Sequence, residues 1–414
     1  MILASMTDKI KNMIKREVYM QRIRPFINTE LIKVFTGIRR AGKSVMLELV
    51  KEELKNSGVD EKNFLCMNFE QFANSQILDA QSLYEKIVEF QKNAQGKTYL
   101  FLDEIQEVEG WEKCINSCRV DFDCDIYITG SNAKLLSGEL ATYLAGRYVE
   151  FVIYPFSFAE FMEMSRQKNP QADKSTCFMQ FIKTGGMPFL SNFGGDDSAK
   201  NQYLMDIYNS VVLKDVVKRN NIRDVDTLER IVSYAFSNIG HIFSATSLSK
   251  YFKSENRKIS HDTILNYLKF CTDAFLIYKI NRYDLEGKKI VSVNEKYYCA
   301  DHGLREAVFG KNIQNIDQIL ENIVCLELLR RNFKVFVGKK GDTEIDFIAE
   351  KQDKKIYVQV TYLLASEETV KREFSAFNSI KDNFPKYVVS MDDFDFSQNG
   401  IIHKNIKDFL LMEF

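Results

Sequence analysis

The residues with the clearest chemical meaning lie near the N-terminus, where two glycines, a lysine and a serine follow a short apolar run. Residues 37–44 read Gly-x-x-x-x-Gly-Lys-Ser, between the strand-like run 31–35 and a helical pattern that begins at Val45. Glycines at these positions let the backbone wrap a phosphate, so that N–H groups and the helix N-terminus point at it. The pattern predicts a phosphate-binding loop made by Gly37, Ile38, Arg39, Arg40, Ala41, Gly42, Lys43 and Ser44.

Two adjacent carboxylates further along the chain suit the same chemistry. Residues 99–102 form an apolar strand pattern that ends in Asp103 and Glu104. In nucleotide hydrolases with such a loop, the lysine contacts the β- and γ-phosphates, and the serine and the strand-end Asp hold Mg²⁺. We therefore expect Lys43 on the phosphates, Ser44 and Asp103 on Mg²⁺, and Glu104 as the group that activates water, with ATP and Mg²⁺ bound. Taken alone, Asp103 and Glu104 fit a solvated turn as well as they fit a catalytic pair. The phosphate-binding loop earlier in the chain favours the catalytic interpretation.

Two more positions are candidates for sensing or stabilising the γ-phosphate. A third strand pattern, residues 125–129, is followed by Ser131 and Asn132, either of which could orient water or cap the next helix. We predict Ser131 as the sensor, and the sequence does not choose it over Asn132. Arg147 follows a helical pattern and precedes another strand. It fits an arginine finger that stabilises the transition state, acting in trans in an oligomer, and it fits a structural ion-pair partner equally well.

The order of these motifs resembles that of the prokaryotic AAA+-like P-loop ATPases that carry a C-terminal PD-(D/E)xK nuclease-like domain of unknown function. The resemblance covers nearly the whole chain and implies an ATP-binding, ATP-hydrolysing core, without implying a physiological role. Besides the phosphate-binding loop, the resemblance rests on these motifs: residues 102–106 with Trp111, 129–131, 144–147, 155–161, 185–188 and 214–219.

The middle of the chain reads as helical, with a possible lid and a DNA-binding pattern. Residues 166–223 suit a helical lid, whose Lys218 or Arg219 could touch phosphate but fits a solvated helix end better. Residues 224–296 show three helical patterns (228–238, 244–252 and 260–270) and a hairpin signal (275–283 and 288–293), which is the winged helix-turn-helix order. In that fold a DNA groove would meet His261, Asn266 and Lys269, with Arg282, Lys288 and Lys289 near phosphates.

Charge neither requires nor excludes DNA contact by this segment. Residues 241–296 contain ten Lys and Arg against six Asp and Glu, an excess of four positive charges. This excess permits binding to a phosphate backbone but is too small to demand it. A structural or inter-subunit role for the winged helix therefore stays open beside DNA binding.

The last segment, residues 297–414, follows the order of a nuclease-like fold but lacks one chemical group. Glu321, Asp346 and Gln359 match the metal-binding positions, whereas Thr361 stands where that fold uses a lysine. Threonine supplies no cation to activate water or steady the phosphate charge. We expect an inactive nuclease-shaped domain used for interaction or nucleic-acid docking, unless a lysine from elsewhere, such as Lys339 or Lys371, restores the site.

Composition narrows the class of protein. The 414 residues are 45% hydrophobic with a net charge of −1, which excludes a disordered chain and a wholly basic DNA-coating protein. No apolar run is long enough to span a bilayer, so a cytoplasmic protein without membrane contact is expected. The eight cysteines form no Cys-x-x-Cys and read as reduced packing thiols, and the four histidines suggest neither a metal site nor a triad. Asp301-His302-Gly303 reads as a hydrogen-bonding loop.

Together these patterns predict an α/β fold of four parts. They are an AAA+-type ATPase core over 1–165, the lid over 166–223, the winged helix over 224–296 and the nuclease-like domain over 297–414. The predicted function is Mg²⁺-dependent ATP hydrolysis coupled to rearrangement of the last two domains. The alternatives are a nucleotide-gated regulatory scaffold that binds DNA or protein with little hydrolysis, and an ATP-dependent nuclease. The expected partners are ATP, DNA through the winged helix, and a second copy of the chain or an unidentified protein.

Overall fold

The chain folds into two compact units. The computed structural model describes residues 13–133, 144, 146–287, 289–310, 315–341 and 343–413. Unit 1 comprises Met1–Tyr154 with Asp273–Phe275, and unit 2 comprises Pro155–Thr272 with Leu276–Phe414. Residue 165, where the ATPase core is expected to end, lies inside helix α7 (Phe158–Lys168) of unit 2, and the core boundary stays a prediction. Helical periodicity continues through that position, so the sequence offered no break there.

Unit 1 is a five-stranded parallel sheet with the strand order β2-β3-β4-β1-β5. Because all strands run the same way, the loops that follow them meet at one edge, where ligands bind in sheets of this kind. The strands are β1 (Ile32–Thr36), β2 (Phe64–Asn68), β3 (Thr98–Asp103), β4 (Cys124–Thr129) and β5 (Tyr148–Val152). The helices are α2 (Glu17–Ile23), α3 (Lys43–Asn56), α4 (Ala80–Gln91) and α5 (Trp111–Asp121), with short 3-10 turns at Arg24–Phe26, Glu61–Asn63, Phe72–Asn74 and Ile105–Glu107.

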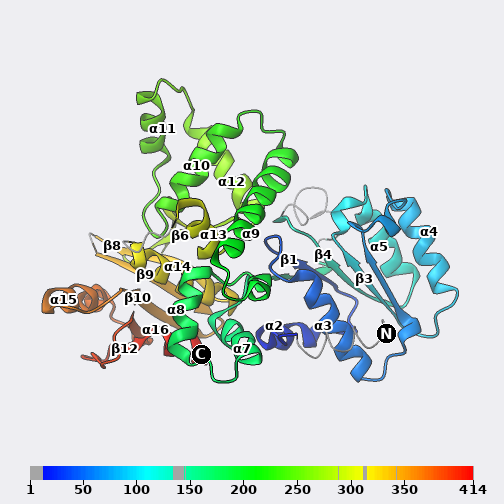
Figure 1. Ribbon diagram of the computed structural model, residues 1–414, viewed down its shortest axis with the longest axis horizontal. Helices are drawn as coiled ribbons and strands as arrows, with labels where there is room; N and C mark the ends of the chain where they lie inside the picture. The colour runs from blue at the N-terminus through cyan, green and yellow to red at the C-terminus, as the bar shows by residue number, and fades with distance from the viewer. Residues whose placement is uncertain are drawn as a thin grey trace. The chain divides into compact units, whose positions relative to one another are not determined.

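Apolar side chains on both faces hold this sheet between helices. Ile32 and Val34 of β1 share one buried cluster with Leu83 of α4 and Ile115 of α5. Helix α3 packs on β1, β3 and β4 and contributes none of its side chains to that cluster, and Figure 1 shows it across the sheet from α5. Strands buried on both faces explain the nearly continuous apolar runs in the sequence.

Unit 2 begins with helices and ends in a seven-stranded mixed sheet of order β12-β11-β10-β9-β8-β6-β7. The helices are α7, α8 (Lys174–Thr184), α9 (Asp197–Ser210), α10 (Val225–Ser237), α11 (Ala245–Ser254), α12 (His261–Asp273), α13 (His302–Phe309), α14 (Ile316–Arg330), α15 (Glu367–Ser375) and α16 (Ile406–Leu411). A π-helix spans Val211–Lys218, and 3-10 helices span Pro188–Phe193 and Ala376–Ser379. The strands are β6 (Ile277–Asp284), β7 (Lys289–Cys299), β8 (Lys334–Lys340), β9 (Thr343–Lys351), β10 (Lys354–Val360), β11 (Lys386–Ser390) and β12 (Ile402–Asn405).

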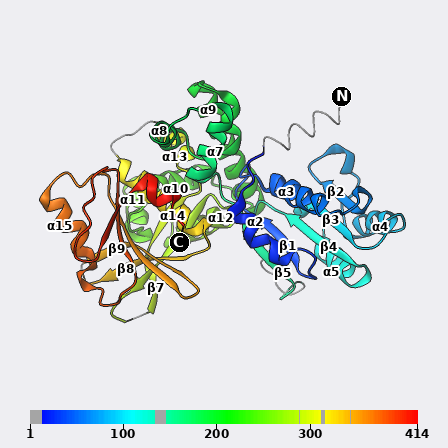
Figure 2. The same ribbon diagram turned by 90° about the horizontal axis from the view of Figure 1, so that it is seen from below.

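The hairpin expected to be a free wing is part of this larger sheet. Strands β6 and β7 follow α10, α11 and α12 in the predicted order, and the three helices lie together above β6 in Figure 1. However, β6 also pairs in parallel with β8, with Arg282 opposite Val337. Residue 296, the expected end of the winged helix, falls inside β7, and that boundary stays a prediction. Figure 2 shows β7, β8 and β9 on the same side of unit 2. Strand pairing over such a distance along the chain leaves no local signal in the sequence.

Candidate functional site

The predicted phosphate-binding loop lies between β1 and α3, at the carboxyl edge of the unit 1 sheet. Two of its residues need the conformational freedom of glycine: Gly37 has φ 133° and Gly42 has φ 101°. A Cβ on Gly37 would lie only 2.2 Å from the carbonyl oxygen of Ile153, so a side chain there would displace the backbone. Since α3 begins at Lys43, the unpaired N–H groups of its first turn open toward the loop.

The ammonium of Lys43 lies at the centre of the loop. Lys43 is buried, and its Nζ donates to the carbonyl oxygens of Gly37 (3.1 Å) and Ile38 (3.3 Å). The same Nζ lies 3.6 Å from Oε1 of Glu104. The structure thus brings together two residues 61 positions apart that the sequence assigned to one reaction.

Asp103 is held by the ends of three adjacent strands. Thr129, at the end of β4, donates its hydroxyl to Oδ1 of Asp103 (2.6 Å), and Asn68, at the end of β2, donates its amide to Oδ2 (2.7 Å). Burial raises the pKa of Asp103, while hydrogen bonds from Thr129 and Ser44 act in the opposite direction. Asn68 and Thr129 are not predicted as site residues. Both are polar and follow apolar runs of strand length, which is the signal that could have identified them.

Glu104 has an unusual backbone conformation that aims its carboxylate. Its φ is 55°, in the left-handed region that non-glycine residues rarely adopt. Its N–H donates to the hydroxyl oxygen of Thr129 (2.8 Å), and Gln106 donates its amide to Oε2 (2.5 Å). Thr129 therefore fixes both acidic residues, because one hydroxyl accepts from Glu104 and donates to Asp103.

A cavity of about 360 Å³ opens beside these groups. It is lined by Ser44, Asn68, Gln71 and Asp103, among others. The Ser44 hydroxyl is hydrogen-bonded to the Asp103 carboxylate, and both groups supply the oxygen atoms that Mg²⁺ prefers. The residues therefore fit the predicted cation, which in sites of this class takes one or two protein ligands and completes its shell with phosphate and water.

The remaining predicted positions of unit 1 divide into two groups. Ser131 and Asn132 are both buried directly after β4, and the structure does not choose between them as a sensor. Arg147 immediately precedes β5, where its carbonyl oxygen accepts from the N–H of Ile32 (2.9 Å) and its side chain donates to Asn116 (2.9 Å).

Arg147 thus lies at the amino edge of the sheet, whereas the loop follows the carboxyl end of β1. Five residues of strand, roughly 16 Å, separate these edges. A contact of Arg147 with its own loop is therefore excluded, and a finger acting in trans stays a prediction.

Several predicted positions of unit 2 have structural partners. Arg219 pairs with Asp215 (3.4 Å), which agrees with a helix end better than with a phosphate contact. The hydrogen-bonding role expected for residues 301–303 is confirmed, but the expected loop is wrong, because α13 begins at His302 and Asp301 caps it. Asp301 accepts from the N–H groups of Gly186 (2.7 Å) and Gly303 (2.8 Å). The Gly-Gly pair is required there, because a Cβ on Gly185 would lie 2.0 Å from the Asp301 carboxylate.

On α12, the three groove candidates His261, Asn266 and Lys269 are exposed. Lys288 lies outside the described residues, and the side chain of Lys289 is not described.

The positions predicted to form a nuclease-like site lie near one another in unit 2, together with a lysine that was not predicted. The main-chain N–H of Asp346 donates to the side chain of Gln359 (3.2 Å), and Thr361 directly follows β10. The lysine brought to Glu321 and Asp346 is Lys296 of β7, which the sequence pattern did not single out.

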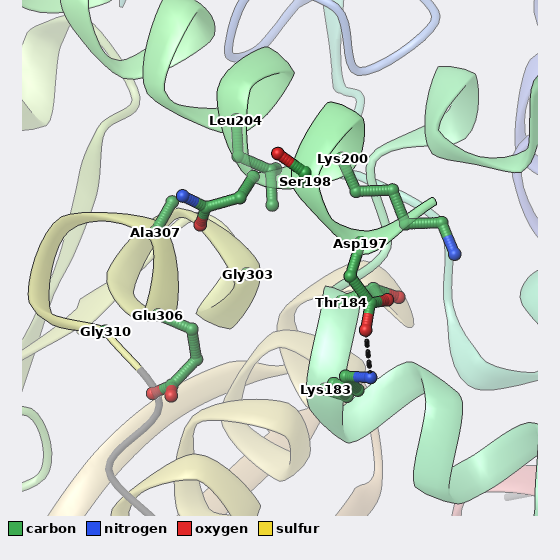
Figure 3. Close-up of a pocket in the computed structure, with 11 residues that line it drawn as sticks. Lys183, Thr184, Asp197, Ser198, Lys200, Leu204, Gly303, Glu306, Ala307 and Gly310 are labelled. Atoms are coloured by element: carbon green, nitrogen blue, oxygen red, sulfur yellow. Dashed lines mark hydrogen bonds and ion pairs between the residues drawn. The ribbon is translucent and has the colours of Figure 1, made fainter. Parts of the chain in front are cut away.

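Other features of the described chain do not suggest a competing catalytic centre. A hollow of about 310 Å³ in unit 2 is lined by Lys183, Asp197 and neighbouring residues, and Figure 3 shows the side chains of these two pairing with each other. All eight cysteines are free thiols. Among the described residues no helix is long and apolar enough to cross a membrane.

Two family models match successive parts of the chain. Residues 29–162 match a family model described as an AAA domain, and residues 176–315 match a domain of unknown function, DUF8612. An uncharacterized protein of Haemophilus influenzae is 41% identical over 380 residues, which are 92% of this chain and 94% of that protein. The uncharacterized protein MJ1544 of Methanocaldococcus jannaschii is 32% identical over 365 residues, covering 85% of this chain and 79% of the other.

Among solved structures, the Walker-type ATPase PABY2304 of Pyrococcus abyssi is similar over 71% of this chain and 94% of its own, at 15% identity and a TM-score of 0.48.

Proposed function

This chain belongs to one family with its Haemophilus influenzae and Methanocaldococcus jannaschii relatives and has an AAA-type P-loop ATPase domain, and we propose that it hydrolyses ATP with Mg²⁺. The observation that carries the proposal is the buried group of Lys43, Asp103, Glu104 and Thr129 at the end of the phosphate-binding loop. These four residues combine a phosphate-binding cation, a metal ligand, a base and a group that orients both acids.

Each residue has a separate task in the proposed reaction. The loop N–H groups and Lys43 bind the phosphates, and Ser44 with Asp103 would hold Mg²⁺, which when bound offsets the negative charge of the phosphate oxygens. Glu104 accepts the proton of the attacking water at its carboxylate. The bonds from Thr129 and Gln106 keep this carboxylate in place, which limits the number of orientations that it can sample before the reaction.

We propose further that the loop communicates with the chain that leaves unit 1. Arg16 is buried, and its guanidinium donates to the carbonyl oxygens of Ala41 in the loop (2.9 Å) and of Tyr154 (2.7 Å). Gly37 of the same loop packs against Ile153, the residue that precedes Tyr154. A movement of the loop on nucleotide binding or hydrolysis therefore shifts Tyr154, the last residue of unit 1 before the chain enters unit 2.

Binding and turnover can be tested separately with two variants. Lys43→Ala removes the phosphate-binding cation and is expected to lose affinity for a fluorescent ATP analogue, whereas Glu104→Gln keeps that affinity and loses turnover. The matched control is Glu107→Gln, an exposed residue three positions on, which should behave like the wild type. Equal ATP turnover by wild type and Glu104→Gln would exclude the proposed role of Glu104.

A second candidate function is DNA binding by α12. His261, Asn266 and Lys269 are exposed on this helix, while Ile264 and Leu268 face the core. The exposed side chains offer donors to base edges or phosphates. If α12 binds DNA, Lys269→Glu weakens binding to a duplex and abolishes any stimulation of ATP turnover by that duplex. If the wild-type chain neither binds a duplex nor responds to it, this candidate is wrong.

A further inference from the structure

The side chain of Lys296 lies among the three acidic residues of the nuclease-like part of unit 2. It is 3% exposed, and its Nζ lies 2.8 Å from Oε1 of Glu344, 3.2 Å from Oε1 of Glu321 and 3.8 Å from Oδ1 of Asp346. The lysine comes from β7, Glu321 from α14, and the other two acids from β9. One ammonium thus joins three elements that are far apart in the sequence.

The charges around Lys296 keep it positively charged. The carboxylates of Glu321, Asp346 and Glu344 all lie within 3.8 Å of its ammonium, which favours the charged form of the lysine. An ammonium has three protons to share and no lone pair, so it satisfies the oxygens that a metal ion would otherwise bind. The residue therefore acts as a cation fixed in the chain.

The acidic oxygens also have other partners. The Tyr298 hydroxyl donates to the same Oε1 of Glu321 (2.6 Å), and the N–H of Val360 donates to Oδ2 of Asp346 (2.9 Å). These bonds and the ammonium leave the carboxylates oriented toward protein groups. Among the residues that the structure describes, no three His, Cys, Asp or Glu side chains are arranged to hold a metal ion.

A backbone turn lies against the same carboxylates. A Cβ on Gly240 would be 2.6 Å from Oε2 of Glu321, and Ile242 forms a β-bridge with Lys296. The N–H of Phe243 donates to the carbonyl oxygen of Glu295 (3.0 Å), so residues 240–243 follow β7 past the cluster. The backbone at Gly240 therefore lies directly against the carboxylate of Glu321.

We propose that Lys296 is a built-in cation that takes the place of the divalent metal in the nuclease-like part of unit 2, so that this part has no metal-dependent hydrolytic centre. The residues do not suit a metal ion because the ammonium of Lys296 already lies within 3.8 Å of all three carboxylates, and a tyrosine hydroxyl and a main-chain N–H donate to two of them. This inference also explains how the fold tolerates Thr361: the positive charge near the acids comes from β7 instead of β10.

Metal binding by the full-length, nucleotide-free protein tests the proposal without any change to Lys296. Mn²⁺ is titrated and followed by electron paramagnetic resonance in wild type, Asp346→Asn and Asp103→Asn, and nicking of plasmid DNA is measured in parallel. We expect the wild type and Asp346→Asn to behave alike, with no Mn²⁺ binding and no nicking of DNA that depends on Asp346. Binding or nicking that is lost in Asp346→Asn and kept in Asp103→Asn overturns the proposal.

Removing the lysine tests the claim from the other direction. Lys296→Met leaves three acids without their cation, so its melting temperature should fall and should rise again by about 2–4 °C on addition of Mn²⁺. Lys279→Met, which removes a partly exposed partner of Glu295 from the same hairpin, is the matched control and should not respond to Mn²⁺. If Lys296→Met folds but its melting temperature does not change on addition of Mn²⁺, the claim that the ammonium takes the place of a metal ion is contradicted. If that variant does not fold, the wild-type titration still decides.

Discussion

The hydroxyl of Thr129 makes two hydrogen bonds, and Thr129→Val removes both with almost no change of volume. The N–H of Glu104 loses its acceptor (2.8 Å), and Oδ1 of Asp103 loses a donor (2.6 Å). Both groups are buried, so water does not readily replace the hydroxyl. The substitution therefore tests whether this threonine positions the two acids that the proposed reaction needs.

The size of the effect follows from the two lost bonds. A buried N–H left unsatisfied costs about 1–3 kcal/mol, and a hydrogen bond to a carboxylate is worth about 1.5–3 kcal/mol. The free energy of unfolding of Thr129→Val should thus fall by about 2.5–6 kcal/mol. If the loss of orientation of the two acids raises the activation free energy by roughly 1.4–2.8 kcal/mol, kcat falls about 10- to 100-fold.

The assay combines urea unfolding with steady-state ATP turnover, using Thr98→Val as the control. Thr98 is also buried and hydrogen-bonded, but it begins β3, at the opposite edge of the sheet from Asp103. Both variants should be less stable than the wild type, and only Thr129→Val should lose kcat. A Thr129→Val enzyme with wild-type kcat, or an equal loss of kcat in Thr98→Val, would refute the positioning role.

Three further predictions concern groups outside the acidic pair. Arg16→Met removes both donors to the carbonyl oxygens of Ala41 and Tyr154, so the loop at Ala41 should be less ordered and the Kd for an ATP analogue should rise about tenfold; an unchanged Kd would contradict the role of Arg16. Lys33→Met leaves the fully buried Asp125 without its ion-pair partner and should lower the free energy of unfolding by about 3–5 kcal/mol in urea titrations, with partial recovery in Lys33→Met/Asp125→Asn. Burial lowers the pKa of His403 below 6.5, so the unfolded chain binds a proton more readily than the folded one. The melting temperature of the wild type should therefore fall as the pH drops from about 6.5 through the folded pKa, and this slope should be shallower in His403→Gln, with equal slopes opposing the assignment.

The sequence contained most of the information for the loop and the strand that carries the acids. The glycine and lysine spacing predicted the loop, and apolar runs before Lys43 and Asp103 predicted the strands that position it. The partners that hold Asp103, namely Asn68 and Thr129, end other strands. Their role depends on the order of strands in the sheet, which is decided by packing between distant segments.

Two other outcomes show the same limit. The position of Arg147 before a strand was clear from the sequence, but only the parallel pairing of β5 with β1 puts it at the edge opposite the loop. Lys296 is 25 residues from Glu321 and 50 from Asp346, and no spacing rule connects a lysine on an edge strand to acids on a helix and another strand. Helix α14, which carries Glu321, packs against both β7 and β9, and only this tertiary packing puts the three elements beside one another.

The most direct test of the account is the rate of phosphate release at saturating ATP and Mg²⁺ by wild type and by Glu104→Gln. General-base catalysis is typically worth about 10²–10⁴-fold, so Glu104→Gln should retain ATP binding and lose turnover by about that factor, while Glu107→Gln should match the wild type. If wild type and Glu104→Gln release phosphate at the same rate, the chain does not hydrolyse ATP by the mechanism proposed here.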